Sequence, residues 1–520
     1  MKIHLFAMAV SVLAVAMGAF ADPAAERPNI ILILADDLGP GMLSCNGQKI
    51  VKTPHIDRLA DEGISFENYY GGVFCAPARW MLMTGMHDGR IGGLENNRAG
   101  LLIKRDSGEI TEEEFQKQFA ELKAKAHPIA DNEVFLAEVA RQAGYKTAQF
   151  GKLDRGFLTW HERVKRFGWD HYEGLYSHVR CHGFYPPYIW RDGEKVELEG
   201  NPYPNCGKAS QDGMDEPVGK FGKTYCPDVF VESLLTYIRE HGEAVRAGKK
   251  VKPFFIYHPS QLPHGPSAVP YIHEDYINDK RLDLSEKKYA TMVKFLDNHV
   301  GRIMDELRTQ GLDENTIVFF ASDNGHEMYS GPFMDYKKQK TPDGERYDLL
   351  DHKFRTSEVD DVFNGAGGRA GLKRSGYQGG MQCPLFARWP GKISAGQKTK
   401  LLTVHYDFLA TVADLGGIEV PRGKDGISYL PTMLGKPQTK SHDYVVVHNR
   451  HRIMGGSALI MKDGFKLIED NRTGEYQLYN ILEDNEERHE LSAEYPEKVR
   501  QMAKILKREI DSPRPDLETN

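Results

Sequence analysis

Cysteine is scarce in this sequence, with six residues in 520. Six cysteines cannot form a disulfide framework that replaces a hydrophobic core in a chain of this length. A strong charge of one sign is also missing, because 67 Lys and Arg oppose 74 Asp and Glu, for a formal net charge of -7. This mildly acidic balance argues against nucleic acid or an anionic membrane as the main partner. What remains is ordinary globular composition, 40% hydrophobic and 27% charged, with ample apolar material for a core.

Long hydrophobic runs are absent beyond the first 21 residues. Residues 1–21 have the features of a secretory signal peptide, with Lys2 near the start, an apolar run and a small-x-small cleavage site before Asp22. A membrane anchor is the alternative, but the run falls short of the roughly 20 residues that span a bilayer comfortably. No cysteine stands at the cleavage point to carry a lipid. We therefore predict an exported protein, periplasmic or secreted, with no membrane span in its mature form.

Predicted strands and helices alternate along most of the chain. The apolar run at 30–35 is typical of a strand buried on both faces of a parallel sheet. The further predicted elements are a helix at 131–144, strands at 146–150 and 253–257, a helix that Ser285 caps and Gly311 ends, and a strand at 316–321. Repeated strand–helix–strand order predicts an α/β fold, with a large, mostly parallel sheet flanked by helices.

The last hundred residues have a different pattern. Short predicted strands at 445–447, 458–461 and 465–468 are separated by turn sequences, and a helix is predicted at 496–508. We predict a smaller C-terminal α+β subdomain with an antiparallel sheet. The predicted division is a signal peptide at 1–21, a catalytic domain at 22–430 and the subdomain at 431–520. Segments 201–227 and 328–372 are predicted loops.

Polar residues follow the predicted strands directly. Asp36 and Asp37 follow the first strand, and Asp323 and Asn324 follow the strand at 316–321. Ligands bind outside the carboxyl ends of the strands in open parallel sheets, so these side chains are expected to face one crevice. Oxygen ligands suit a hard divalent cation, Ca²⁺ or Mg²⁺. Taken singly, each pair is more often a turn or a helix cap.

A further segment reads Cys-Ala-Pro-Ala-Arg from Cys75 to Arg79, followed by Leu-Met-Thr-Gly. Taken alone, such a cysteine is usually a small buried hydrophobe. The full pattern resembles the signature of type I sulfatases, in which a maturase oxidises the cysteine to formylglycine. Similar motifs cover almost the whole mature chain: RPNIILILADDLG at 27–39, TPHIDRLADEGISFENYY at 53–70, FFASDNG at 319–325, CPLFARWPG at 383–391 and YQLYNILEDNEERHEL at 476–491. This resemblance implies the alkaline-phosphatase-like fold.

The resemblance also implies roles for individual residues. Cys75, as formylglycine, would join Asp36, Asp37, Asp323 and Asn324 on the metal ion, and its hydrated aldehyde would be the nucleophile. The remaining predicted roles are Arg79 holding the formylglycine hydrate, Lys152 and Lys373 binding sulfate, and His264 protonating the leaving oxygen.

Four positions depart from the family pattern. Ala78 stands where serine is usual, and Gln378 and Gln382 replace an acid and an arginine in a segment that we interpret as structural. Asp154 stands where the family has the histidine proposed to deprotonate the sulfated hydrate. A carboxylate can serve as that base if burial raises its pKa, but Asp154 can equally be a turn residue with the base supplied elsewhere.

The substrate class is predicted from residues 168–195, which resemble a segment of bacterial carbohydrate sulfatases. This segment contains His178, Arg180 and His182, side chains suited to a sugar with a second anionic group, although a merely folded loop is the alternative. His326, just after the metal pair, is predicted to line the same pocket. The predicted substrate is a sulfated glycan. Rival interpretations are a phosphodiesterase or phosphonate monoester hydrolase of the same superfamily, and a non-catalytic glycan-binding relative.

Overall fold

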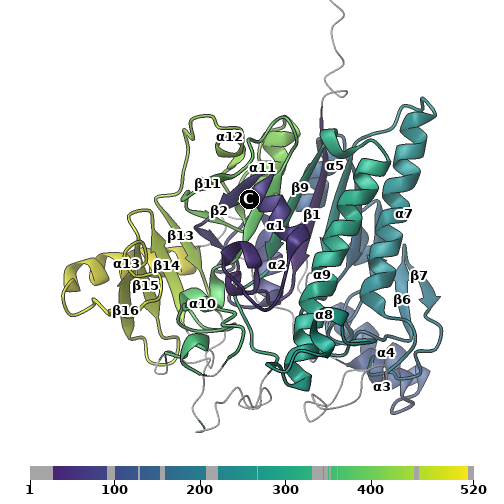
Figure 1. Cartoon of the computed structure of the whole chain (residues 1–520), viewed down its shortest axis with the longest axis horizontal. Coiled ribbons are helices and arrows are strands. Elements are labelled where there is room, and N and C mark those ends of the chain that lie inside the picture. Colours follow the sequence, from purple (N-terminus) through teal and green to yellow (C-terminus); the bar gives the residue numbers. More distant parts are fainter. Residues whose placement is uncertain are drawn as a thin grey trace, which may run out of the picture.

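The computed structural model describes residues 27–90, 100–126, 129–152, 158–206, 221–265, 267–330, 344, 350, 353–359, 361–449 and 456–512. A ten-stranded sheet runs through the centre, in the order β11-β2-β10-β9-β1-β8-β4-β5-β6-β7 (Figure 1). Its strands are β1 (Asn29–Ala35), β2 (Ile64–Phe66), β4 (Lys146–Gly151), β5 (His171–Gly174), β6 (Tyr188–Arg191), β7 (Glu194–Glu197), β8 (Phe254–Pro259), β9 (Thr316–Ser322), β10 (Leu385–Arg388) and β11 (Gln397–Thr399).

The centre of this sheet is parallel. Strands β9, β1, β8, β4 and β5 run the same way, while β10 lies antiparallel between β9 and β2, and β6 and β7 add antiparallel pairs at the other edge. The parallel centre confirms the predicted architecture. It also means that four of the strands that carry predicted site residues end at one edge of the sheet.

Both faces of β1 are buried, which explains its uninterrupted apolar sequence. Ile30, Leu32 and Leu34 join the core against α2 (Cys75–Thr84), α5 (Leu136–Gln142) and α11 (Asp407–Leu415). The alternate residues of β1 face α1 (Pro54–Asp61), α7 (Cys226–Arg246) and α9 (Leu284–Thr309), of which α7 and α9 are the long helices on one side of the sheet in Figure 1. The remaining helices are α3 (Leu101–Asp106), α4 (Glu112–Lys125), α6 (His161–Arg166), α8 (Glu274–Ile277), α10 (Gln378–Met381) and α12 (Leu430–Met433).

A second sheet lies at one side of the molecule (Figure 1). It is antiparallel, in the order β13 (Tyr444–Val447), β14 (Ser457–Met461), β15 (Phe465–Glu469) and β16 (Tyr476–Asn480), and α13 (Pro496–Asp511) covers one face. Its other face packs into the main core with α10. The predicted antiparallel unit is therefore confirmed, with β16 as a strand that the sequence analysis did not identify. A third, two-stranded pairing joins β3 (Tyr69–Tyr70) to β12 (Thr403–Val404).

Several predicted boundaries were wrong. The helix predicted from residue 131 begins only at Leu136, where the Glu138 side chain accepts a hydrogen bond from the Phe135 backbone. Asp283, not Ser285, caps α9, because its carboxylate accepts the backbone N–H of Glu286. The predicted loop at 201–227 ends in helix, since α7 begins at Cys226. Segment 168–195, for which a folded loop was the alternative interpretation, contains β5, β6 and the first half of β7.

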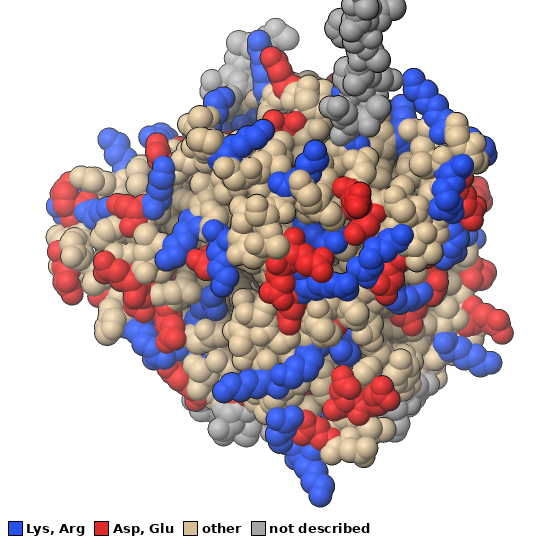
Figure 2. Space-filling view, turned by 45° about the horizontal axis from the view of Figure 1, so that its top comes forward, with Lys and Arg blue, Asp and Glu red and all other residues tan. Residues whose placement is uncertain are grey.

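The surface is consistent with the balanced composition. On the face in Figure 2, Lys and Arg side chains alternate with Asp and Glu. Among the described residues, no helix is both long and apolar enough to span a bilayer.

Candidate active site

Four parallel strands deliver polar side chains to one place at the carboxyl edge of the sheet. β1 leads into the two aspartates, β9 into the Asp–Asn pair, β4 into the first lysine and β8 into a loop that ends at the histidine. The side chains brought together in this way are Asp36, Asp37, Asp323, Asn324, Lys152 and His264. All are at most 2% exposed, so the predicted crevice is a buried charged cluster.

Cys75 opens α2 and points into this cluster. Phe74 before it is extended, and Pro77 lies in the first turn, where its missing N–H breaks no helical hydrogen bond. The Cys75 Sγ donates to Asp37 Oδ1 at 3.7 Å. Burial, followed by the charges of Asp36 and Asp37, raises the pKa of the Cys75 thiol well above its usual value.

Each carboxylate of the cluster is paired with a cation. Arg79 donates from Nε to Asp323 Oδ2 at 2.9 Å and reaches Asp36 Oδ1 with Nη2 at 3.5 Å. Lys152 forms a buried ion pair with Asp36, and Lys373 Nζ lies 2.6 Å from Asp37 Oδ2. These pairs explain how so many charges stay buried, since an isolated buried charge is very costly.

The two neighbouring aspartates are shifted in opposite directions. Burial alone would raise the pKa of Asp37, but Lys373, His264 and Lys152 together hold it well below its usual range. Burial raises the pKa of Asp36, and the nearby Lys152 only partly offsets this. Asp37 also has a left-handed backbone, at φ 67°, a conformation that aspartate tolerates better than most residues. Its backbone N–H donates to Asp323 Oδ1 at 3.1 Å, which ties the β1 and β9 ends together.

The donor set fits a hard divalent cation. Ligand atoms of Asp36, Asp37, Cys75 and His264 all lie within 4.8 Å of one another. Asn324 donates to Asp37 Oδ1 at 2.7 Å, while its own Oδ1 and the Oδ1 of Asp36 are buried and accept no hydrogen bond. Buried oxygens left without donors are what a Ca²⁺ or Mg²⁺ site needs. Both carboxylate oxygens of Asp323, like both of Asp37, already accept hydrogen bonds, so the role of each as a ligand stays a prediction.

His264 connects this cluster to the predicted substrate segment. Its Nδ1 contacts the Gly265 carbonyl at 2.5 Å, and its Nε2 lies 3.3 Å from Lys373 Nζ and 3.4 Å from Asp37 Oδ2. Burial and then Lys373 lower the pKa of His264 well below its usual value. His182 stacks on it with ring centroids 4.2 Å apart, and His178 meets His182 edge-on at 4.7 Å. The structure thus places His182 against the predicted acid and His178 against His182.

Arg180 and His326 are placed differently. Arg180 is 1% exposed, forms an ion pair with Asp106 and lies over the Tyr188 ring at 4.4 Å. His326 is 1% exposed and fills the space between Gly39 and Gly365, where any Cβ would collide with its ring or with backbone. Both are packed residues in this structure, and their substrate contacts stay predictions. Asp154 lies outside the described residues.

Tyr329 was missed by the sequence analysis. Its hydroxyl donates to Asp37 Oδ2, the oxygen that Lys373 also contacts, and its ring lies 5.1 Å from that of His264. Glu327 was missed too: fully buried, it pairs with Arg374 next to Lys373. No spacing rule points to these residues. The only sequence signal was their position in the segment that follows Asn324.

Comparisons with known proteins agree with this geometry. The profile described as "Sulfatase" matches residues 28–418, and one described as "N-sulphoglucosamine sulphohydrolase, C-terminal" matches residues 371–515. The N-acetylgalactosamine-6-sulfatase of Canis lupus familiaris is 29% identical over 434 residues, covering 81% of this chain and 68% of that protein. The N-acetylgalactosamine-6-O-sulfatase of Bacteroides thetaiotaomicron is 26% identical over 543 residues, covering 92% of this chain and 93% of its own.

A solved structure from work on glycosaminoglycan metabolism by Bacteroides thetaiotaomicron superposes with a TM-score of 0.68, at 23% identity, over 94% of this chain and 100% of the other. The fold and the buried strand-end cluster define a hydrolase of the alkaline-phosphatase-like kind. Since the family profile matches well over half of the chain, the protein belongs to the sulfatase family and is a sulfuric ester hydrolase.

Proposed function

We propose that this sulfatase removes sulfate from a glycan, with a formylglycine made from Cys75 as its nucleophile and a divalent cation, Ca²⁺ or Mg²⁺, at the strand ends. The observation that carries the proposal is the convergence of the Cys75 Sγ with Asp36, Asp37 and His264 within 4.8 Å. A thiol at the start of a helix, surrounded by metal-type oxygens and lysines, is where the family motif requires its modified cysteine.

The chain supplies the charges that the sulfate group needs. When bound, the cation would neutralise sulfate charge and make the hydroxyl of the formylglycine hydrate more acidic. Lys152 pairs with Asp36 and Lys373 pairs with Asp37, and the two lysines come from different loops. Each can contact a sulfate oxygen. Arg79, fixed by Asp323 at 2.9 Å, holds the hydrate in place.

His264 supplies the proton for the departing alcohol. A carbonyl can only accept, so the Nδ1 contact with Gly265 assigns the neutral-state hydrogen to Nδ1 and leaves Nε2 facing the cluster. After Nε2 is protonated, it can donate to the sugar oxygen as the S–O bond breaks. Water then restores the aldehyde hydrate, and the net reaction converts the ester and one water into the alcohol and sulfate.

Release of sulfate from the enzyme needs a base, and we propose Asp154 for it, beside the alternative of a base from elsewhere. In Asp154→Asn, sulfation of the enzyme should proceed while release of the bound sulfate slows, so a burst of one alcohol per site would precede slow turnover. A burst followed by wild-type turnover would exclude Asp154.

The proposed substrate is a sulfated glycan with N-acetylgalactosamine 6-sulfate as the first unit to test, because two relatives named above are sulfatases of that unit. The stacked pair of His182 and His264 gives a flat surface beside the proton donor, on which a sugar ring can rest. Arg180 helps to shape this side through its contacts with Asp106 and Tyr188.

Two measurements test the proposal. Mass spectrometry of the peptide containing residue 75, from protein co-produced with a formylglycine-generating maturase, should show that the cysteine has lost its sulfur. An unmodified thiol together with retained glycan binding would indicate a non-catalytic relative. Sulfate release should be measured on defined sulfated sugars, with a phosphate ester of the same leaving group as the comparison. Faster cleavage of the phosphate would favour the phosphodiesterase or phosphonate hydrolase alternative.

Export, the domain division at residues 430–431 and the maturase as partner belong to the same proposal. Cleavage before Asp22, seen as the N-terminus of protein recovered outside the cytoplasm, would support export. Retention of residues 1–21 in that protein would contradict cleavage of a signal peptide, and recovery of the protein only in the cytoplasm would contradict export.

A further inference from the structure

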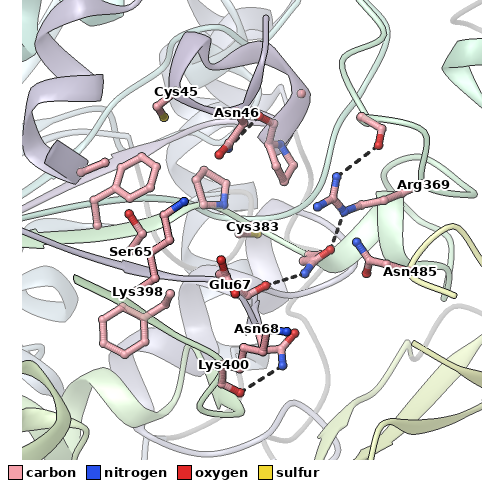
Figure 3. Close-up of a pocket in the computed structure, with 18 of the residues that line it drawn as sticks. Cys45, Asn46, Ser65, Glu67, Asn68, Arg369, Cys383, Lys398, Lys400 and Asn485 are labelled. Carbon is pink, nitrogen blue, oxygen red and sulfur yellow. Dashed lines mark hydrogen bonds between the residues drawn. The ribbon is translucent and has the colours of Figure 1, made fainter. Parts of the chain in front are cut away.

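A second polar cavity lies beyond the active-site cluster, toward the β11 edge of the main sheet. It encloses about 590 Å³ between β2, β10, β11, the loop that follows β1 and the end of β16 (Figure 3). That volume is in the range of pockets that hold small ligands. Its polar lining includes Arg369, Lys398, Lys400, Glu67, Asn68 and Asn485, labelled in Figure 3. We call it the edge cavity.

Arg369 is the most informative residue of the edge cavity. Its Nε donates to Gln382 Oε1 at 2.5 Å and its Nη1 to the Ala366 carbonyl at 3.1 Å, both neutral acceptors. It forms no ion pair with any residue that the structure describes. Burial lowers the pKa of Arg369, and the nearby Tyr70 and Glu486 do not fully offset this. A largely buried guanidinium without a carboxylate partner is a position where an anionic ligand gains binding energy.

Two exposed lysines extend this positive charge. Lys398 lies on β11 and Lys400 just after it, and neither forms an ion pair with a described residue. In Figure 3 they stand across the cavity from Arg369, so an anionic group between them can meet more than one cation. These charges are solvent-facing, unlike the lysines of the active-site cluster.

The remaining lining points to a sugar rather than to a simple anion. Glu67 and Asp61 also line the cavity, and they would repel a ligand that presents negative charge on every side. A saccharide with one acidic group and several hydroxyls matches both the basic and the acidic side chains of the lining. Its acidic group can pair with the cations, and its hydroxyls can donate to the carboxylates and to the amide oxygens of Asn68 and Asn485. The mixed lining thus fits an acidic sugar unit.

The cavity adjoins the loops that carry catalytic groups. Pro40, in its wall, follows Asp37 by three residues, and Arg369 precedes Lys373 by four. Between the two sites, the loop at Gly39 packs against the loop at Gly365, with His326 between them. The edge cavity is therefore a neighbour of the cluster and separate from it.

We propose that the edge cavity is a second, non-catalytic binding site for an acidic sugar unit of a polymeric substrate, held by Arg369, Lys398 and Lys400. The proposal rests on the proposed function for the identity of the polymer. It predicts that long substrates gain affinity that a monosaccharide does not.

The test compares Lys398→Gln/Lys400→Gln with a control, Lys392→Gln/Lys436→Gln, that removes two exposed lysines outside the cavity. For a chondroitin 6-sulfate hexasaccharide, the KM of the cavity variant should rise about fivefold, as expected for lost ion pairs. Its kcat/KM for N-acetylgalactosamine 6-sulfate should stay within about twofold of wild type, since no catalytic group is changed. An unchanged hexasaccharide-to-monosaccharide ratio would overturn the proposal.

Calorimetric titration with an unsulfated chondroitin hexasaccharide gives a readout that needs no turnover. Binding should be weaker in the cavity variant than in the control and should weaken further with added salt. Arg369→Gln should repeat this loss and Arg369→Lys should partly restore binding. If wild type binds the oligosaccharide this way but releases no sulfate from any sugar, the proposed function fails and the cavity proposal stands. Equal binding by all variants, or binding of inorganic sulfate alone, sinks the cavity proposal.

Discussion

The active-site cluster and the edge cavity are neighbouring parts of the same molecule, and both contain basic side chains, yet they treat charge in opposite ways. In the cluster each cation contacts a carboxylate, as Lys373 contacts Asp37 at 2.6 Å, and the groups are nearly inaccessible. In the edge cavity the hydrogen bonds of Arg369 to described residues all go to neutral acceptors, and Lys398 and Lys400 are exposed. Paired buried charges position atoms for chemistry, whereas unpaired accessible charges attract a ligand.

Removal of the metal ion should produce the largest difference between the two regions, because it should abolish sulfate release and leave oligosaccharide binding in the edge cavity intact. A divalent cation at Asp36, Asp37 and Asn324 would supply Lewis-acid chemistry that Lys152 and Lys373 cannot replace, so treatment with a chelator should reduce sulfate release by about 10³-fold or more. Added Ca²⁺ or Mg²⁺ should restore activity, and the more effective ion identifies the preferred cofactor. Binding of the unsulfated hexasaccharide should be unchanged, because no lining carboxylate of the edge cavity belongs to the metal site. Loss of both functions on chelation would show that the regions are not independent.

Single lysines should give the next largest contrast. Lys373→Met removes a cation from the site where sulfate charge must be stabilised, and we expect kcat/KM for a monosaccharide sulfate to fall about 10²- to 10³-fold. Lys398→Met, the matched change in the edge cavity, should change that value less than twofold. Steady-state kinetics with one substrate and both variants make the comparison. Similar losses from the two would contradict the assignment of catalysis to the strand-end cluster alone.

The two regions also differ in how far the sequence predicted them. The active-site cluster was predicted from local sequence patterns, and the edge cavity was not. Strands β1 and β9 are continuous apolar runs followed by Asp36–Asp37 and Asp323–Asn324, so a parallel sheet and the meeting of Asp37 with Asn324 at its edge were predictable. The motif starting at Cys75 also predicted a residue of this cluster, since the Cys75 Sγ lies 3.7 Å from Asp37 Oδ1. Each of these signals is local in the chain.

What could not be predicted depends on contacts between distant segments. Tyr329 reaches Asp37 across 292 positions of sequence, and Arg369 meets Gln382 only because a loop folds back on α10. Gln378 was interpreted as structural from the sequence, but its partner was not predictable: Lys466 of the second sheet donates to Gln378 Oε1 at 3.1 Å, beside the buried Lys466–Glu487 pair. The capping residue of α9 was predicted wrongly for a simpler reason: Asp283 and Ser285 are both good capping residues, and the sequence does not distinguish them.

Tyr329 should have an effect of intermediate size. Tyr329→Phe removes a hydrogen bond to a charged oxygen of Asp37, a loss of about 1.5–3 kcal/mol, or roughly 10- to 100-fold in kcat/KM. Apparent Ca²⁺ affinity should change as well, because the hydroxyl orients a predicted metal ligand. Tyr289→Phe is a matched control: its buried ring lies 6.3 Å from Tyr329, and its hydroxyl has no hydrogen-bond partner in the described part of the chain. Equal losses from both variants would point to packing instead.

The smallest expected effect concerns Asp361, in the loop that helps to separate the two regions. Its carboxylate accepts the backbone N–H of Phe363 at 3.2 Å and of Gly365 at 3.1 Å, and burial raises its pKa to about 6. Because the folded-state pKa lies above the ordinary 3.8, the folded protein holds the proton longer than the unfolded chain. Stability associated with this group is therefore complete below pH 3.8 and declines until the pH exceeds about 6.

Asp361→Asn removes this titration but also removes one hydrogen-bond acceptor oxygen. The test of the raised pKa is therefore the pH dependence of the variant's stability, and its absolute Tm does not test it. Between pH 5 and pH 8, wild type should lose about 2 °C in Tm relative to the variant. Scanning calorimetry of both proteins at the two pH values measures the difference, and Asp414→Asn, an exposed carboxylate on α11, provides the background change. An identical pH dependence of Tm in wild type and Asp361→Asn would mean that this carboxylate keeps its ordinary pKa. Protonation of Asp361 would then contribute nothing to the stability of the loop between the cluster and the cavity.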